Sequence, residues 1–399
     1  MLTILCIATY FKGDPFLREC KAQGCTVLLL TTDKLVAAEW PREAIDEIHS
    51  VPREANDQAI RHHVDTIARR HRIDRIAALD DFDVEVAAML REHLRVPGMG
   101  RTTAGRFRDK LAMRMQARAL GIPVPEFSAV FNDQEVGDWA ARVTPPWLLK
   151  PRSSAAAIGI KKVADREALW RALDDAGDAR AGCVLEQFVP GDVYHVDSIV
   201  WGGQVVFAVA CKYGRPPMEV SHQGGLFITR RLPDDSEEGR PLLAMNRTLQ
   251  QGLGLRRGVS HTEFIQGDGS GGSGGLVFLE TSARVGGAFI VDTIDAATGI
   301  NLWREWAKVE VAGEAGSYTV PAHRDGYAGI VLTLARQEQP DMSAYTDPEI
   351  VTTIRKDFHA GLIVSAPEPQ RVESLIDTFT KRFYADFFAT APPPDRPVE

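Results

Sequence analysis

The chain contains 399 residues, of which 46 are Lys or Arg and 54 are Asp or Glu, so its formal net charge is −8. Hydrophobic residues make up 44% and charged residues 25%, which is typical of a globular protein and excludes a disordered or collagen-like chain. At this length we expect two or three domains. The acidic balance disfavours a nucleic-acid-binding protein, which normally presents a basic surface.

The cysteines and the apolar segments indicate the cellular compartment. The five cysteines are odd in number and form no CxxC pair, so neither a disulfide framework nor a thiolate zinc site is expected. Residues 1–9 are apolar but lack a basic segment before them and a cleavage site after them, which predicts a buried strand rather than a signal peptide. No apolar run approaches the ~20 residues of a membrane span. We therefore expect a cytoplasmic protein with no membrane partner.

The first hundred residues alternate between strand-like and helix-like segments. The expected strands are residues 2–8, 26–30 and 73–79, and the expected helices are residues 15–23, 56–71 and 84–93. This alternation predicts a parallel sheet with helices on both faces, which binds ligands at the carboxyl ends of its strands. Residues 9–14 and 80–83 follow two such ends, and no GxGxxG dinucleotide fingerprint follows the first strand.

The remainder of the chain changes to an antiparallel, α+β pattern. A helix over residues 103–120 is predicted to end at Gly121. Gly202 and Gly203 predict a hairpin turn between two strands. Residues 267–275 are rich in glycine and lie between two further strands, so we interpret them as a mobile hairpin loop rather than a domain boundary. The Pro-rich residues 391–399 are predicted to be a disordered tail.

Two lysines and a loop of small residues are candidates for binding phosphate. Lys110 lies near a helix start, and Lys150 ends an apolar strand. The loop that follows Lys150 contains Ser153, Ser154 and Gly159, and its backbone N–H groups could approach a phosphate closely. Each feature also has an ordinary explanation, namely a solvated helix face and a lysine at a sheet edge.

A strand that breaks at Pro-Gly offers a site for a purine. Its backbone groups could bind the adenine edge, and the Glu186 carboxylate could accept a hydrogen bond from the exocyclic amine. Farther along, two predicted strands carry Glu263 and Glu280, whose oxygen atoms suit Mg²⁺. Ser282 and Arg284 share a strand face with Glu280 because side chains alternate along a strand. An ordinary strand and turn, and a solvated salt-bridged sheet face, are the structural alternatives.

The order of these features is more specific than any one of them. Together they resemble the ATP-grasp superfamily of carboxylate ligases over roughly residues 1–310. The segments that carry the resemblance are Asp109-Lys110, Leu149-Lys150-Pro151, Leu185-Glu186-Gln187-Phe188-Val189-Pro190-Gly191, His261-Thr262-Glu263-Phe264 and Phe278-Leu279-Glu280-Thr281-Ser282-Ala283-Arg284.

The resemblance implies a mixed α/β and α+β fold, in which a parallel-sheet pre-ATP-grasp domain precedes an ATP-grasp fold of two α+β subdomains. It divides the chain into a Rossmann-like domain (1–100), a linker and small lid (101–185), a catalytic subdomain (186–310), a C-terminal portion that completes it (311–390) and the tail (391–399).

The resemblance also implies roles for particular residues. Lys110 and Lys150 would contact ATP phosphates, and Arg284 would neutralise an acyl phosphate or a substrate carboxylate. Mg²⁺, or Mn²⁺ in its place, would be bound by Glu263, Glu280 and Ser282, where Ser282 replaces the asparagine usual in the family and is a weaker ligand. The remaining nucleotide contacts would come from Ser153, Ser154, Gly159, Glu186, Gln187, Phe188, Val189 and Asp192.

The leading functional hypothesis is an ADP-forming ligase that activates a carboxylate as an acyl phosphate for attack by an amine. Two alternatives are a biotin carboxylase-like enzyme that forms carboxyphosphate from bicarbonate and an ATP-binding protein without turnover. We expect small-molecule carboxylate and amine partners, with a homodimer as the default assembly. Candidate substrate determinants are residues 9–14, 80–83, 213–231 and the last ninety residues, with Lys212, Tyr213, His222, Arg230 and Arg231 as polar groups.

Overall fold

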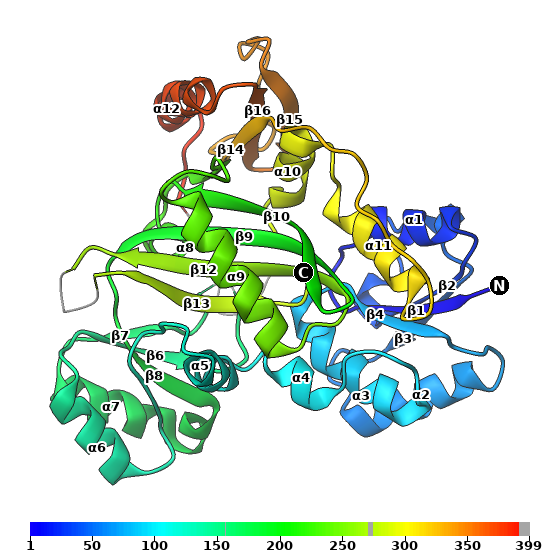
Figure 1. Cartoon of the computed structure of the whole chain (residues 1–399), viewed down its shortest axis with the longest axis horizontal. Coiled ribbons are helices and arrows are strands. Elements are labelled where there is room, and N and C mark those ends of the chain that lie inside the picture. Colours follow the sequence, from blue (N-terminus) through cyan, green and yellow to red (C-terminus); the bar gives the residue numbers. More distant parts are fainter. Residues whose placement is uncertain (156, 270–273, 391–399) are drawn as a thin grey trace.

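Three sheets organise the chain in a computed structural model that describes residues 1–155, 157–269 and 274–390 (Figure 1). The predicted tail 391–399 and residues 270–273 of the glycine-rich loop lie outside the described residues. Within the described ranges, no helix combines the length and the apolar character that a membrane crossing requires.

The N-terminal sheet is parallel, as predicted, with strand order β3-β2-β1-β4. Its apolar strands are buried between helices, with α1 on one face and α2 and α3 on the other. The edge strand β3 was not predicted, and its side chains are mostly half-buried. The elements are β1 (Thr3–Ala8), α1 (Asp14–Ala22), β2 (Thr26–Thr32), β3 (Glu47–Val51), α2 (Asp57–Ala68), β4 (Arg75–Ala78) and α3 (Val84–Leu94).

A small antiparallel sheet with strand order β5-β8-β6-β7 follows in the chain. Its core includes Trp139 and Trp147, whose ring centroids lie 5.6 Å apart. The elements are β5 (Phe127–Ala129), α6 (Asp133–Arg142), β6 (Trp147–Pro151), β7 (Lys161–Val163), α7 (Arg166–Ala176) and β8 (Cys183–Gln187).

The third sheet has eight antiparallel strands in the order β13-β12-β9-β10-β11-β14-β16-β15. The predicted Gly202-Gly203 hairpin joins β9 to β10, and β12 pairs with β13 as the second hairpin requires. The elements are β9 (Gly191–Trp201), β10 (Gln204–Tyr213), α8 (Pro217–Gln223), β11 (Phe227–Arg231), α9 (Gly239–Leu253), β12 (Gly258–Gly267), β13 (Leu276–Ser282), α10 (Ile290–Thr298), α11 (Leu302–Ala312), β14 (Tyr327–Leu334), β15 (Ile350–Lys356), β16 (His359–Ala366) and α12 (Pro369–Asp386).

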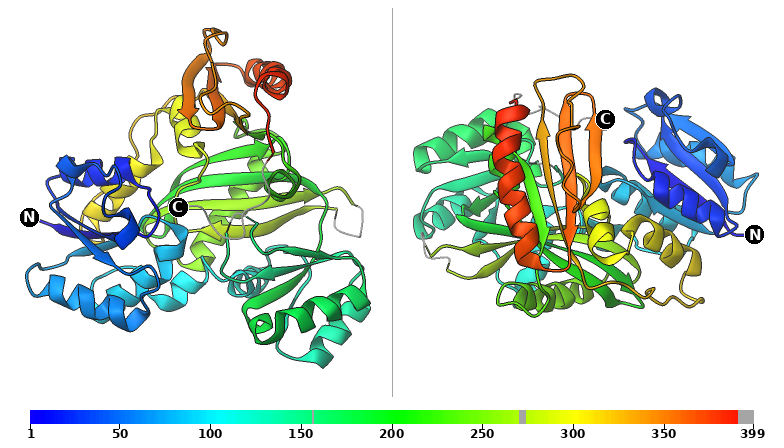
Figure 2. Two further views of the ribbon diagram at one scale, coloured as in Figure 1. Left: turned by 180° about the vertical axis from the view of Figure 1, so that it is seen from behind. Right: turned by 90° about the horizontal axis from the view of Figure 1, so that it is seen from above.

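Alternation along β9 gives this sheet two different faces. Tyr194, Val196 and Val200 belong to the apolar core that includes residues of α9. The intervening residues His195 and Asp197 face the other side, and both are completely buried. Figure 2 shows α12 packed against the C-terminal strands, on the side of the molecule away from the N-terminal domain.

The single helix predicted over residues 103–120 is wrong, because the chain forms α4 (Arg101–Gly105) and α5 (Lys110–Ala119) instead. Asp109 caps α5 by accepting hydrogen bonds from the backbone N–H groups of Leu111 and Ala112. The same carboxylate pairs with Arg152. A cap and an ion pair at one residue therefore restart the helix at Lys110.

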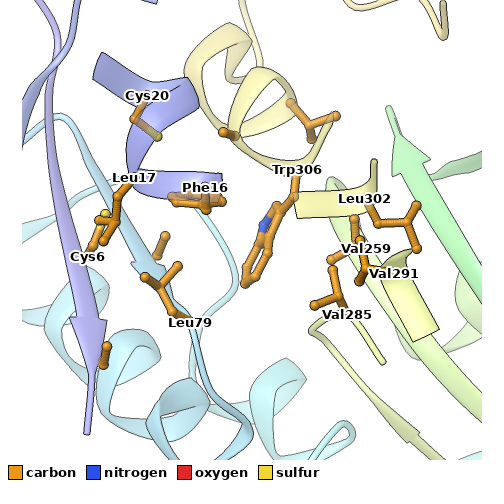
Figure 3. Packing of buried hydrophobic residues seen from close by; sticks show 14 of the residues in the cluster. Cys6, Phe16, Leu17, Cys20, Leu79, Val259, Val285, Val291, Leu302 and Trp306 are labelled. Carbon is orange, nitrogen blue, oxygen red and sulfur yellow. The ribbon is translucent and has the colours of Figure 1, made fainter. Parts of the chain in front are cut away.

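An apolar core joins the N-terminal domain to the large sheet. Phe16 on α1 packs edge-on against Trp306 on α11, with 5.0 Å between ring centroids (Figure 3). Val259 on β12 belongs to the same cluster. Burial of these side chains holds the N-terminal domain against the antiparallel sheet.

Candidate active site

A cavity of about 630 Å³ lies where the three sheets meet. The predicted site residues that line it are Lys110, Lys150, Ser154, Glu186, Gln187, Phe188, Val189, Glu263, Glu280, Ser282 and Arg284. In the described part of the chain, three predicted residues lie outside this lining: Ser153, Gly159 and Asp192. Asp192 is exposed, and its carboxylate lies 2.8 Å from Lys212 Nζ. Its partner is therefore a lysine outside the cavity lining.

Two lysines from different elements point into the cavity. Lys110 opens α5, and its Nζ donates to the Ser154 carbonyl at 2.7 Å and lies 3.1 Å from Glu280 Oε2. Lys150 on β6 is mostly buried, and its Nζ lies 2.6 Å from Glu186 Oε2. The loop after β6 therefore starts beside two ammonium groups, which is the arrangement expected of a phosphate site.

Glu186 on β8 is completely buried and pairs with two cations. Its second partner is Arg114, whose Nη2 lies 2.9 Å from Glu186 Oε1. Burial would raise the pKa of Glu186, but Arg114 and Lys150 outweigh it and lower that pKa. Arg114 was not among the predicted site residues, although it lies four residues after Lys110 and therefore on the same face of α5.

Glu263 and Glu280 are directly opposite each other on β12 and β13. Burial alone would raise the pKa of Glu280, but Lys110 and Lys150 reverse the effect and lower it to about 2. Glu263 Oε1 accepts a 2.9 Å hydrogen bond from the Tyr213 hydroxyl. Two adjacent carboxylates, one of them held in its ionised form, are a donor set that fits a hard divalent cation.

Part of the cavity lining is apolar. Phe188 follows β8 and is half-buried, and the Lys162 ammonium lies 3.7 Å from the centre of its ring. Val189 and Ile265 also line the cavity and belong to one small apolar cluster. Other apolar lining residues are Ile158, Ile160, Met218, Val220, Phe227 and Leu279.

Residues of the N-terminal domain complete the cavity wall, as expected for residues 9–14 and 80–83. Tyr10 and Phe82 line the cavity, and their ring centroids lie 5.2 Å apart. Lys12 pairs with Asp80, and Arg108 pairs with Asp81. Lys12, Asp80 and Asp81 line the same cavity beside these two rings.

The segment 213–231 contributes to the site only in part. Helix α8 lines the cavity through residues 217–221. His222 Nε2 lies 3.2 Å from the Ala157 carbonyl, which links α8 to the loop after β6. Arg230 and Arg231 are instead paired with Glu373 and Asp325, away from the cavity lining.

The comparisons with known proteins agree with this architecture. No protein-family model matches the chain. The chain is 23% identical over 246 residues to the L-arginine-specific L-amino acid ligase of Bacillus subtilis, a match that covers 60% of this chain. An L-amino acid ligase from Bacillus licheniformis superposes with a TM-score of 0.73 at 18% identity, covering 98% of this chain and 99% of the other. This likeness shows that the chain has the fold of the ATP-grasp ligases.

A second ATP-grasp structure, the N5-carboxyaminoimidazole ribonucleotide synthetase of Thermus thermophilus, gives a TM-score of 0.72 at 17% identity, with 98% of this chain and 99% of that chain covered. At such identities the likeness establishes the fold. The chain spans 58% of the length of the B. subtilis relative. The predicted fold class is thus confirmed.

Proposed function

We propose that this protein is an ATP-dependent ligase that activates a carboxylate as an acyl phosphate and joins it to an amine. The observation that supports the proposal most strongly is that the predicted basic and acidic side chains lie in one cavity. Lys110 on α5, Lys150 on β6 and Arg284 in the segment after β13 line one cavity together with the opposed carboxylates Glu263 and Glu280. Such a cavity can hold a triphosphate and neutralise the charge that moves during phosphoryl transfer.

The same residues fit the nucleotide and its metal ion. Lys110 and Lys150 would bind phosphate oxygens, while Phe188 and Val189 would contact the base. Glu263 and Glu280 would hold Mg²⁺, with Ser282 beside them on β13. When bound, Mg²⁺ supplies positive charge that stabilises the phosphate oxygens.

The reaction needs positioning rather than a covalent nucleophile from the protein. A substrate carboxylate oxygen attacks the γ-phosphorus, and the bond to the β–γ bridging oxygen breaks, so that ADP leaves. The amine nitrogen then attacks the acyl carbon, the acyl–oxygen bond breaks, and phosphate leaves as the nitrogen loses a proton. Arg284 would neutralise charge on the acyl phosphate, and the loop after β6 would exclude water from it.

The proposed substrates are amino acids, and the support comes from the relatives. The two Bacillus proteins are named as L-amino acid ligases. The cavity itself offers an aromatic surface at Tyr10 and Phe82 beside paired charges. We therefore propose that one amino acid supplies the carboxylate and a second supplies the amine.

A phosphate-release screen with ATP, Mg²⁺ and pairwise sets of amino acids tests this function. Turnover that requires both an acid and an amine supports the proposal, whereas bicarbonate-dependent ADP formation without an amine would favour the carboxylase alternative. Lys150→Ala and Glu280→Ala are expected to lose at least 100-fold in activity, by analogy with the removal of one transition-state contact. Lys381→Ala on α12 is the matched control, because that lysine is exposed and lies outside the cavity lining.

A further inference from the structure

A row of buried polar side chains crosses the large sheet behind the cavity. It runs from Thr229 on β11 through His195 and Asp197 on β9 to His261 on β12. His195 Nε2 lies 2.7 Å from Thr229 Oγ1, and His195 Nδ1 lies 2.6 Å from Asp197 Oδ2. Asp197 Oδ1 lies 2.9 Å from His261 Nδ1. Of these four residues, His261 lines the cavity and the other three are completely buried.

Strand register explains why the row ends at the candidate metal site. Asp197 pairs with His261, and His195 pairs with Glu263, in the antiparallel ladder between β9 and β12. Glu263 in turn lies opposite Glu280 on β13. Because alternate residues share a face, these five side chains form one continuous polar block on a single side of the sheet.

The chemistry of the row fixes the orientation of His261. A carboxylate only accepts hydrogen bonds, so both imidazole Nδ1 atoms that contact Asp197 must carry hydrogen. His261 therefore presents Nε2 toward Glu263, at 3.6 Å from Oε1. Tyr213 donates to that same Oε1, and its ring packs on His195 with 4.7 Å between centroids.

The backbone that follows Arg284 covers the Asp197–His261 contact. A Cβ atom on Gly286 would lie 2.9 Å from Asp197 Oδ1 and 3.0 Å from His261 Nδ1. A side chain at this position would thus push into the pair. The close approach of the glycine backbone keeps the contact out of the cavity and leaves Nε2 as the part of His261 that faces it.

We propose that Asp197 and His195 are positioning residues, which orient His261 and, with Tyr213, the Glu263 carboxylate for the nucleotide-bound cation. This inference rests on the proposed function, since it assigns Glu263 to the metal. Burying an ionised carboxylate is costly unless it is fully paired, yet Asp197 occupies the centre of the sheet with two partners. Groups that orient a metal ligand are worth 10–100-fold in metal affinity or activity.

An alternative role for these buried side chains is to bind a metal ion directly. One ligand atom from each of His195, Asp197 and His261 can be chosen so that all three lie within 4.8 Å of one another. Each of these side chains already has a hydrogen-bond partner in the row, which is therefore complete without an ion. Metal analysis of the purified protein distinguishes the two cases.

The test compares Asp197→Asn with Ser198→Ala. Ser198 is equally buried on the same strand but on the opposite face, where Asn246 donates a 2.7 Å hydrogen bond to it. The readout is the Mg²⁺ concentration that half-saturates binding of a non-hydrolysable ATP analogue. We expect Asp197→Asn to raise that concentration about 10–100-fold, and Ser198→Ala to leave it within twofold of the parent, as expected of a site that only contributes to stability.

A second comparison shows whether Asp197 acts through His261. In the His261→Gln background, Asp197→Asn is expected to add less than threefold, because the residue it orients is already gone. If the increases in half-saturating Mg²⁺ concentration from the two substitutions multiply, the proposal is overturned. An unchanged Mg²⁺ requirement in Asp197→Asn would also overturn it. So would a stoichiometric metal ion that the purified parent protein holds and Asp197→Asn loses. If Asp197→Asn does not fold, His195→Gln must give the same shift. A protein that shows the Mg²⁺ shift but no acid- and amine-dependent turnover would refute the proposed function alone.

Discussion

Replacing Glu186 by glutamine should destabilise the fold severely, because it leaves the buried Arg114 and Lys150 side chains without their carboxylate partner. Arg114 and Glu186 are both completely buried, and Lys150 is only 9% exposed. The Arg114 and Glu186 side chains lie 2.9 Å apart, and at an effective dielectric constant of 20 a unit charge pair at that distance attracts by about 6 kcal/mol before desolvation is counted. Breaking a buried pair from one side typically costs about 3–5 kcal/mol, which is the loss we expect for Glu186→Gln.

The double variant provides the sharper test of this reasoning. Arg114→Met alone leaves Glu186 paired with Lys150 at 2.6 Å, so it should cost less than Glu186→Gln. Arg114→Met combined with Glu186→Gln removes one stranded cation and leaves Lys150, which reaches the cavity. The double variant should therefore be more stable than Glu186→Gln alone, by about 1–2 kcal/mol.

Urea denaturation followed by tryptophan fluorescence measures these differences, since Trp139 and Trp147 lie in the core of the small sheet that carries Glu186. The three variants and the parent form a double-mutant cycle. If the double variant is less stable than Glu186→Gln by the whole cost of Arg114→Met, the two charges are independent. That additive result would refute the account of how Glu186 is held.

Three further predictions follow from local structure. Burial raises the pKa of Asp83 from 3.8 to about 7 despite the hydrogen bonds from Thr9, so the folded protein binds this proton more tightly than the unfolded chain. The resulting stabilisation is complete below pH 4 and is lost as the pH rises through 7. Denaturation across this range should show the free energy of unfolding of the parent falling by up to about 4 kcal/mol relative to that of Asp83→Asn. If the two free energies change in parallel with pH, the prediction is wrong. Ser282→Asn should lower the Mg²⁺ concentration needed for nucleotide binding severalfold, because an amide oxygen is the better ligand, and titration with an ATP analogue checks this. Gly191→Ala should lower the melting temperature by several degrees, because Gly191 has a φ of +150° and a Cβ atom there would overlap the Gln266 carbonyl on the neighbouring strand β12. An unchanged melting temperature would show that β9 and β12 can separate freely.

The fold was largely predictable because hydrophobic periodicity carries most of it. The parallel sheet followed from the apolar runs of β1, β2 and β4, and both predicted hairpins formed. The break between α4 and α5 was missed in part because the ion pair of Asp109 with the distant Arg152 is a tertiary contact that sequence spacing does not reveal. Edge strand β3 was missed because its Glu-Ile-His-Ser-Val sequence lacks the continuous apolar character of its neighbours.

The candidate site was predictable to the extent that its residues lie in recognisable sequence segments. Lys110, Lys150 and Glu280 follow from such segments, and they line one cavity. Arg114 and Asp197 do not, because their importance comes from neighbours brought together by packing and strand register rather than by sequence spacing. Asp192 was expected near the nucleotide, but its pairing with a lysine on the adjacent strand is a tertiary contact that sequence spacing does not reveal.

The chemical route through an acyl phosphate is tested most directly by following one oxygen atom. A substrate acid labelled with ¹⁸O in its carboxylate is incubated with the protein, ATP, Mg²⁺ and an amine, and the released phosphate is examined by mass spectrometry. A carboxylate oxygen that attacks the γ-phosphorus and later leaves with it must carry one ¹⁸O atom into the phosphate. Unlabelled phosphate, or label recovered in AMP, would show that the cleft formed by Lys110, Lys150 and Glu280 activates its substrate in another way.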